Sequence, residues 1–472
     1  MSNVPSPMPA SMYPNRPAVS LQVVVIGAGI AGISTAYALG KAGHHVTVVD
    51  KNDGNSKTAR AIRCGPNMTK ILLQWGLEST LKSISQRCSR IDWYSGTTPD
   101  SLGSMILAED FLQDLGAEFY CMEQAQLMSA LRELAQEERV TFHLNSQVLN
   151  ADSITGSVLL HTGEKLYGDI IIGADGYDSI LRSIVTDEVQ EQEAKEGHVI
   201  LSFTISTNIL EADEELRGLM DPSAWSIWIG ESHIIHANVL NQGRDYAVTI
   251  LWGCGSLHRA IPEGDWSTIK AAVNGIGADL DKVEPRVKKL LGHATTISSR
   301  VVFSRSSVDN LICENSRIVL VGEAAHPVLP GVHHSQALSI EDAETLGSLF
   351  SRIGRKDQVS QLLTAYNEIR QPWDKFAVEH SYRNQANLEA KQGPIQEARD
   401  AKIRAMLVQM VGDHMDEELF KEVWGNELSL FSNDAGEKVE DWWCQYGSLI
   451  MRSPHRDSIL SSVAVSVSQD TE

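Results

Sequence analysis

A glycine-rich turn between an apolar strand and a helix constrains this chain more than any other feature. Residues 21–26 form the nearly continuous apolar run expected of a strand buried on both faces. Gly27, Gly29 and Gly32 follow at G-x-G-x-x-G spacing, and a helical pattern then continues to Lys41. Glycine permits a tight turn here, close approach of a pyrophosphate, and packing of the helix on the strand. The pattern predicts a dinucleotide site at the start of the helix.

An acidic residue at the end of the next strand supports this prediction. Residues 46–50 form a second buried strand, and Asp50 closes it 18 positions after Gly32. A carboxylate at that place accepts hydrogen bonds from the ribose of a dinucleotide. The agreement of turn, helix and acid favours a Rossmann-type βαβ unit over a glycine-rich turn without a ligand.

Two later strand ends repeat the pairing of glycine with a carboxylate. Residues 170–172 are an apolar run, and Asp175 and Gly176 follow it in a Gly-Ala-Asp-Gly turn. Residues 317–321 are a third buried run, which leads to Glu323 in Gly-Glu-Ala-Ala-His-Pro. Asp175 is predicted either to orient the pyrophosphate and ribitol of a flavin or only to cap a helix. Glu323 is predicted to bind ribitol hydroxyls.

Composition narrows the class of protein. The chain has 472 residues, of which 42% are hydrophobic, so we expect two or three packed subdomains. The net charge of −21 disfavours nucleic acid and anionic membranes as partners, and no apolar run reaches the roughly 20 residues of a membrane span. The six cysteines form no CxxC pair, so neither a metal site nor a disulfide framework is predicted, and a cytoplasmic location is expected.

The three motifs, in this order and at these spacings, resemble those of the FAD-dependent aromatic hydroxylases. These are group A flavoprotein monooxygenases, a family that includes 4-hydroxybenzoate hydroxylase and salicylate hydroxylase. The resemblance runs from residue 21 to about residue 383, and the Asp-Trp-Trp at 441–443 is similar to the fungal salicylate-hydroxylase-like branch. It implies bound FAD, reduction by NADH or NADPH without a second Rossmann domain, and oxygen transfer from a flavin C4a-hydroperoxide. The residues assigned to FAD are Gly27, Gly29, Gly32, Asp50, Ala61, Gln124, Asp175, Gly176, Glu323 and Gln336.

The chain departs from the family pattern at several positions. Glu323 replaces the usual aspartate, and Gln124 stands where an arginine often bonds the FAD pyrophosphate, so phosphate binding should weaken there. Thr204 and Ala237 occupy the positions of an arginine and a tyrosine that act in catalysis in fungal members. Neither catalytic role is therefore carried over to this chain.

The loop after the third motif is also remodelled. Residues 330–336 replace the family's P-x-x-G-Q-G loop, and side chains take the place of glycine against the flavin. This change either brings His333 or His334 near the substrate or leaves both in solvent. His326 is predicted to anchor the loop. A helix predicted to begin at Ser339 would direct its N-terminus at the flavin pyrimidine edge.

Alternating, tryptophan-rich strands between residues 199 and 252 predict an antiparallel sheet over the substrate. Alternation puts Ile234 and His236 on one face and His233 and Ile235 on the other. His236 and His334 are the two candidate catalytic residues, and His236 is the candidate acceptor of a phenol proton. The alternative is a sheet whose aromatic residues only form core. The tryptophans and histidines expected to cover the pocket are Trp225, Trp228, His233, His236 and Trp252.

The sequence therefore predicts an α/β protein in which a Rossmann-like FAD-binding domain is interleaved with an antiparallel-sheet substrate domain, followed by C-terminal helices. The predicted boundaries are 1–20 for a flexible tail, 21–190 with 300–352 for the FAD-binding domain, 191–299 for the sheet domain, 353–452 for the helical region and 453–472 for a second tail.

The predicted function is an FAD-dependent NAD(P)H monooxygenase of secondary metabolism. It would hydroxylate, with or without decarboxylation, or epoxidise an aromatic, prenylated or polyketide-type small molecule. One alternative is a flavin-dependent dehydrogenase or cyclase that inserts no oxygen. A second is a non-catalytic isoprenoid-binding protein of the same fold, against which the acids at all three strand ends argue.

Overall fold

The computed structural model describes residues 17–54, 60–186, 197–255, 264–265, 267–270, 282–328, 334–409 and 417–452. Most of the first predicted tail and all of the second lie outside the described residues, as does His333. A five-stranded parallel sheet runs in the order β18-β12-β1-β2-β8. Its strands are β1 (Gln22–Ile26), β2 (His45–Val49), β8 (Thr141–His143), β12 (Ile170–Gly173) and β18 (Ile318–Leu320).

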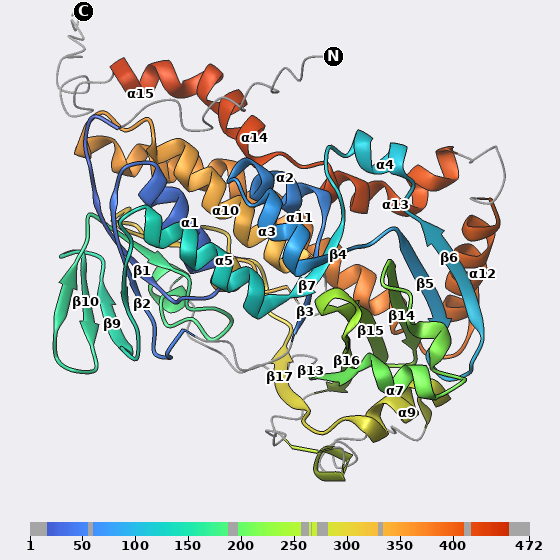
Figure 1. The fold of residues 1–472 in the computed structure, drawn as a ribbon. Helices are drawn as coiled ribbons and strands as arrows, with labels where there is room; N and C mark the ends of the chain where they lie inside the picture. The colour runs from blue at the N-terminus through green and yellow to red at the C-terminus, as the bar shows by residue number, and fades with distance from the viewer. Residues whose placement is uncertain are drawn as a thin grey trace, which may run out of the picture.

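Helices cover this sheet, as its continuously apolar strands require. α1 (Ile30–Lys41) packs between α5 (Gln124–Glu137) and α10 (His334–Phe350), which lie beside it in Figure 1. Both α1 and α10 begin earlier than the sequence pattern predicted, at Ile30 and His334. α10 is buried along almost its whole length because α1, α2 (Pro66–Gln74) and two C-terminal helices surround it.

A seven-stranded sheet forms the second half of the molecule, in the order β17-β13-β16-β15-β14-β5-β6. Neighbouring strands of this sheet pair antiparallel except for β14 and β5, which pair in parallel. The strands are β5 (Arg90–Ser95), β6 (Ser101–Ile106), β13 (Gly197–Ser206), β14 (Ala224–Gly230), β15 (His233–Leu240), β16 (Asp245–Gly255) and β17 (Ser298–Phe303). The division at residues 190 and 300 stays a prediction, and the sheet takes two strands from ahead of residue 190.

Two small sheets and several short helices complete the framework. β3 (Ala61–Cys64), β7 (Tyr120–Glu123) and β4 (Ser85–Arg87) form one small sheet. β9 (Val148–Asp152), β10 (Ser157–Leu160) and β11 (Lys165–Tyr167) form the other, in which β10 and β11 pair antiparallel. The short helices are α3 (Glu78–Ile84), α4 (Glu109–Asp114), α6 (Arg182–Thr186), α7 (Thr207–Ala212) and α9 (Pro285–His293).

The C-terminal helices connect the two halves. They are α11 (Val359–Leu388), α12 (Pro394–Gln409), α13 (Glu417–Phe431), α14 (Ala435–Trp442) and α15 (Ser448–Arg452). α11 and α14 pack on α10, whereas α12 packs on β6 at the far edge of the seven-stranded sheet (Figure 1). The C-terminal region therefore extends from one sheet to the other.

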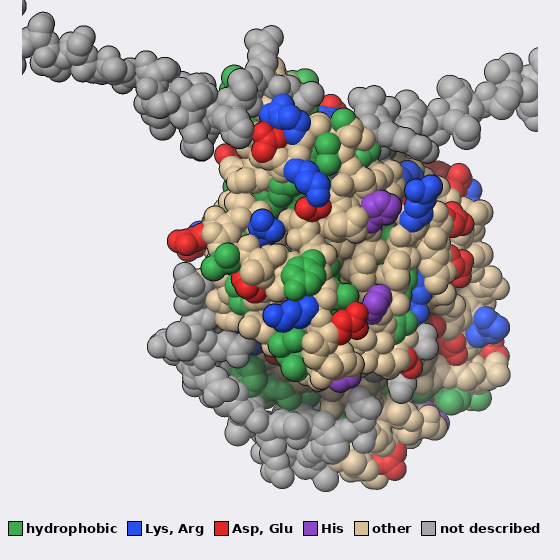
Figure 2. All heavy atoms as spheres, turned by 90° about the vertical axis from the view of Figure 1, so that its left-hand side faces the viewer, with side chains coloured by type: hydrophobic (Ala, Val, Ile, Leu, Met, Phe, Trp, Pro, Cys, Tyr) green, Lys and Arg blue, Asp and Glu red, His purple; other side chains and the backbone are tan. Residues whose placement is uncertain are grey.

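The seven-stranded sheet separates two apolar cores because its side chains alternate between faces. Trp228 and Ile235 pack on the face that carries α9. Trp225 and Ile234 pack on the opposite face, with contributions from α12 and α13. On the face shown in Figure 2, acidic and basic side chains are intermixed. In the described part of the chain, no helix is both long and apolar enough to cross a membrane.

Candidate active site

A polar cleft of about 510 Å³ lies where three strands of the parallel sheet end. Its lining includes Gly29 after β1, Asp175 and Gly176 after β12, and Glu323 after β18. These strands are neighbours in the sheet, so their carboxyl ends meet at one edge. Motifs that are far apart in the sequence thus contribute to a single site.

The glycines of the first motif have two distinct roles. A Cβ atom on Gly27 would lie 2.2 Å from the carbonyl oxygen of Ala174, and one on Gly32 would lie 1.9 Å from that of Gly27. A Cβ on Gly29 would meet nothing within 4 Å. Gly27 and Gly32 are required by packing within the protein, whereas Gly29 borders open space in the cleft.

Asp50 fixes the turn that carries these glycines. Its Oδ2 accepts a hydrogen bond of 2.6 Å from the backbone N–H of Ala28, and its Oδ1 accepts one of 2.7 Å from that of Asn52. The carboxylate is half-buried, and the adjacent Lys51 and Asn52 line the cleft. Asp50 therefore ties the end of β2 to the turn after β1 at the margin of the cleft.

Asp175 uses one carboxylate oxygen for the capping contact that its motif predicts and leaves the other without a partner. Its Oδ2 accepts a hydrogen bond of 2.8 Å from the backbone N–H of Ile180, as a capping residue would. Its Oδ1 is buried without a hydrogen-bond partner in the structure, and burial raises the pKa of the carboxyl group. A buried carboxylate oxygen on the cleft wall is a suitable acceptor for a ligand hydroxyl.

Cationic side chains also line the cleft. Gln124 lines it, at the start of α5, together with Ala61 on β3. Arg60 and Lys51 line the same cleft, and Arg300 lies 3.7 Å from Glu323. Lys51, Arg60 and Arg300 thus bring three positive charges to the cleft, of which Arg300 is paired with Glu323.

The first turn of α10 closes the cleft. Ser335, Gln336 and Ser339 all belong to its lining. The prediction that this helix begins at Ser339 was wrong, because the helix starts at His334. The remodelled loop therefore contributes a helical turn to the site.

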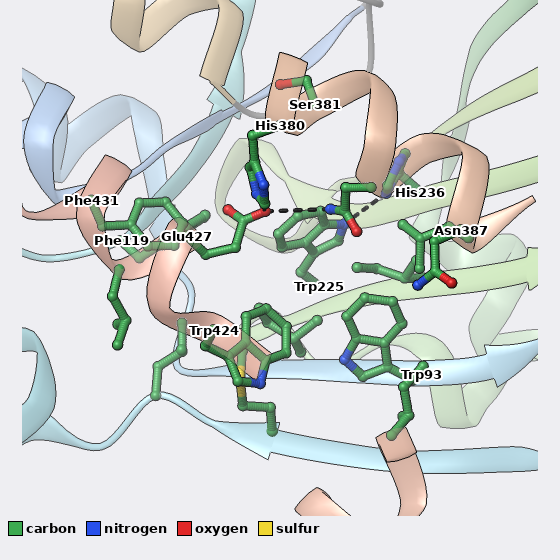
Figure 3. A pocket seen from close by; sticks show the side chains of 18 of the residues that line it. Trp93, Phe119, Trp225, His236, His380, Ser381, Asn387, Trp424, Glu427 and Phe431 are labelled. Carbon is green, nitrogen blue, oxygen red and sulfur yellow. Dashed lines mark hydrogen bonds and ion pairs between the residues drawn. The ribbon is translucent and has the colours of Figure 1, made fainter. Parts of the chain in front are cut away.

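A second cavity, of about 240 Å³, lies on the α13 side of the seven-stranded sheet. Figure 3 shows aromatic side chains from β5, β14 and α13 around it. They include Trp93, Trp225, Trp424, Phe119 and Phe431. Rings from elements far apart in the sequence thus form one aromatic pocket, which suits a flat apolar ligand.

His236 lies on the wall of this aromatic pocket, as the alternation of β15 predicts. Ile234 also lines it, and the indole Nε1 of Trp225 donates a 3.3 Å hydrogen bond to Nδ1 of His236. His233 lies on the other face and stacks on Trp252, with 4.5 Å between ring centroids. The prediction that Trp252 covers the pocket was therefore wrong.

Trp228 also does not cover the pocket, because it lies an odd number of positions from Trp225 on the same strand and faces the other core. Thr204 and Ala237 are absent from the described pocket lining as well. These positions therefore offer no catalytic group to the aromatic pocket.

A carboxylate held by two histidines forms the polar end of the pocket. Glu427 lines it from α13, and its Oε2 accepts a 2.7 Å hydrogen bond from Nε2 of His334. Its Oε1 lies 2.9 Å from Nε2 of His380 and 3.3 Å from Nδ2 of Asn384 (Figure 3). Sequence reasoning proposed His334 but missed Glu427 and His380. These three residues lie on α10, α11 and α13, so no motif within a short stretch of sequence could indicate that they meet.

Arg63 lies between the two cavities. It lines the polar cleft, and its guanidinium carbon lies 4.7 Å from the ring centre of Trp225, which lines the aromatic pocket. Burial lowers the pKa of Arg63 to about 10. The cleft and the pocket therefore adjoin where Arg63 contacts Trp225.

A buried ion network lies behind the cleft. Arg370 contacts Glu341, Asp342 and Asp374 at 2.7–2.8 Å. Nε2 of His326 is 2.7 Å from Asp342, and although burial opposes it, this carboxylate raises the pKa of His326. The grouping of histidine and two acids resembles a metal site, but Arg370 already pairs with both acids. The network ties the middle of α10 to α11 and, through a hydrogen bond from the Gly322 N–H to Asp342, to the third motif.

Comparisons with known proteins give one family and a shared fold. The family described as FAD binding domain matches residues 20–381. The chain is 24% identical over 387 residues to the FAD-dependent monooxygenase OpS4 of Beauveria bassiana (strain ARSEF 2860), covering 80% of this chain and 88% of that protein. It is 25% identical over 391 residues to hispidin-3-hydroxylase of Neonothopanus nambi, covering 78% and 89%. The structure of CtdE in complex with FAD and a substrate matches with a TM-score of 0.72 at 17% identity, covering 92% and 100%.

Proposed function

This chain belongs to the FAD-dependent aromatic hydroxylase family, and we propose that it uses NADH or NADPH and molecular oxygen to hydroxylate an aromatic small molecule of secondary metabolism. The observation that carries the proposal is the adjacency of the two cavities. Arg63 and Trp225 form the wall between a polar cleft that suits a dinucleotide and an aromatic pocket that suits a ring.

The polar cleft fits FAD on two grounds. Gly29 borders open space where a pyrophosphate can approach, and Asp175 presents a buried carboxylate oxygen that lacks a donor. We assign to FAD the residues Gly27, Gly29, Gly32, Asp50, Ala61, Gln124, Asp175, Gly176, Glu323 and Gln336. Lys51, Arg60 and Arg300 would balance the phosphate charge. When bound, FAD supplies the redox chemistry, because it accepts hydride from a nicotinamide and activates oxygen.

The protein's own groups bind and orient the second reactant. Trp93, Trp225 and Trp424 offer ring faces that exclude water and hold a flat substrate. His236 and Glu427 provide polar contacts on the pocket wall. Polyketide-type and prenylated aromatics fit this description, and a ring with a polar substituent fits it best.

The test is turnover with isotopically labelled oxygen. The purified holoenzyme is given NADH or NADPH with a panel of phenols, aromatic acids and prenylated aromatics, and product masses are recorded. We expect nicotinamide oxidation with at least one panel member and one labelled oxygen atom in its product. Substrate oxidation without label would favour a dehydrogenase or cyclase. Tight binding of prenylated compounds without turnover would favour the isoprenoid-binding alternative.

A further inference from the structure

We propose that Glu427 accepts the hydroxyl proton of the aromatic substrate and that His334 and His380 position its carboxylate. The inference deepens the proposed function and depends on it for the identity of the substrate. Within the described pocket lining, Glu427 is the one acidic side chain. It would make the pocket selective for rings that carry a hydroxyl group over rings that carry a carboxylate.

The position of Glu427 on its helix directs it at the ligand. Trp424, Glu427, Leu428 and Phe431 all line the pocket, and their spacing of three or four residues puts them on one face of α13. Figure 3 shows the Glu427 side chain among Trp424, Phe431 and Trp225. A carboxylate on an otherwise apolar helix face carries a desolvation cost, which hydrogen bonds must offset.

The two histidines provide those hydrogen bonds and fix the carboxylate. His334 is buried at the start of α10, and its Nε2 lies 2.7 Å from Glu427 Oε2. His380 lies on α11 with 13% of its side chain exposed, and its Nε2 lies 2.9 Å from Oε1. A carboxylate has about four acceptor sites, so the two imidazole contacts leave Glu427 with further lone pairs that can accept from a ligand hydroxyl. The unit spans three helices, so its geometry is set by the packed fold.

The remaining charged groups of the pocket do not replace Glu427. The guanidinium of Arg399 contacts Asp400 and the backbone carbonyl oxygens of Asn387 and Leu388. Lys402 is exposed at the rim, and His236 lies on the sheet wall with Trp225. A substrate carboxylate beside Glu427 would be repelled, whereas a hydroxyl group can donate to it.

The proposed step transfers one proton. The substrate O–H bond breaks, its electron pair stays on the oxygen, and the proton passes to the Glu427–histidine unit. The ring thereby gains electron density and becomes more reactive toward an electrophilic oxygen atom. His380 is the most exposed member of the unit, so it offers the route by which the proton returns to solvent.

The test uses 4-nitrophenol and its methyl ether, 4-nitroanisole, as ligands of the oxidised holoenzyme. Binding is titrated by difference absorbance, which also reports the fraction of bound nitrophenol that is ionised. For the wild type we expect at least tenfold tighter binding of the phenol than of the ether. We also expect ionised ligand at a pH where free 4-nitrophenol is mostly protonated. In Glu427→Gln, the preference should fall about tenfold and the ionised fraction should be lost.

The matched control is Glu389→Gln. Glu389 also pairs with a histidine, since its Oε2 lies 2.9 Å from Nε2 of His198, but it does not line the aromatic pocket. This variant should behave as the wild type. Unchanged preference and ionisation in Glu427→Gln, or equal losses in both variants, would overturn the proposal.

Two further measurements distinguish a failure of this proposal from a folding defect and from a failure of the proposed function. The FAD content and thermal midpoint of each variant report folding. If Glu427→Gln fails to fold, Glu427→Asp replaces it, and wild-type ionisation in that shortened variant would count against the proposal. Because the oxidised enzyme performs no turnover, absence of labelled product in the earlier assay would contradict the proposed function without affecting this result.

Discussion

The polar cleft and the aromatic pocket differ in how the sequence encodes them. The cleft lies at strand ends, and the acids Asp50, Asp175 and Glu323, which follow three of the strands, each belong to a short motif that can be read locally. The pocket is built from side chains on β5, β14, β15, α11 and α13, which come together only in the folded chain. A family can therefore retain its cofactor motifs while its substrate pocket diverges.

The largest expected effect concerns the buried ion network around Arg370, behind the polar cleft. Arg370→Met leaves three buried acids without their cation, and breaking a buried ion pair in this way costs about 3–5 kcal/mol. We expect loss of FAD and of aromatic-ligand binding together, measured with the free energy of unfolding in urea. Arg355→Met is the control, because the Arg355–Asp357 pair is exposed. Equal stability of both variants would contradict this account of the network.

Lowering the pH should reduce the free energy of unfolding through the protonation of His44, which lies in the half of the molecule that holds the polar cleft. This side chain accepts from the backbone N–H of Leu21 and contacts the carbonyl oxygen of Phe350, and burial lowers its pKa to about 4. The unfolded state binds a proton below about pH 6.5 but the folded state does not, so stability falls as the pH drops from 6.5 to 4. The loss is at most about 3–4 kcal/mol.

The measurement compares unfolding free energies at pH 7.5 and pH 5 for the wild type and His44→Gln. The difference in unfolding free energy between pH 7.5 and pH 5 should be smaller in this variant than in the wild type. His45→Gln, a change at the exposed neighbouring residue, should retain the wild-type difference. An unchanged pH dependence in His44→Gln would exclude His44 as the cause.

Gly29 and Gly32, two glycines of the first motif, face different surroundings and provide a sharper comparison within the cleft. Gly32→Ala forces a methyl group against the carbonyl oxygen of Gly27 and should destabilise the protein by about 1–3 kcal/mol. Gly29→Ala has open space around its new methyl group, so the protein free of cofactor should keep its thermal midpoint while its affinity for FAD falls. Calorimetry with and without FAD separates the two. The reverse pattern would contradict the roles assigned to these glycines.

Changes confined to one cavity should weaken one ligand and spare the other. Asp50→Ala removes a charged acceptor at the turn, and we expect about 1.5–3 kcal/mol weaker FAD binding with 4-nitrophenol binding retained once FAD is saturating. Trp424→Ala should weaken the aromatic ligand about tenfold and leave FAD content unchanged. Fluorescence titration measures the first and difference absorbance the second. Losses of both ligands in either variant would mean that the cavities are not independent.

The sequence was sufficient for the fold class because buried strands, glycine turns and acids are local signals. It also predicted which face of β15 carries His236, because alternation along a strand is a two-residue period. It did not predict that β5 pairs with β14, since that parallel pair joins residues more than 100 positions apart. Glu427 was missed for the same reason: nothing near it in the chain distinguishes it from a surface glutamate on an amphipathic helix.

The measurement that tests the central claim most directly is the amount of FAD bound per chain. The wild-type protein, incubated with FAD and desalted, should show the visible flavin spectrum at one FAD per chain. The paired variants Asp50→Ala and Glu323→Ala should each retain less under the same conditions. A colourless wild-type protein, or full occupancy in both variants, would contradict the convergence of three strand ends on one flavin.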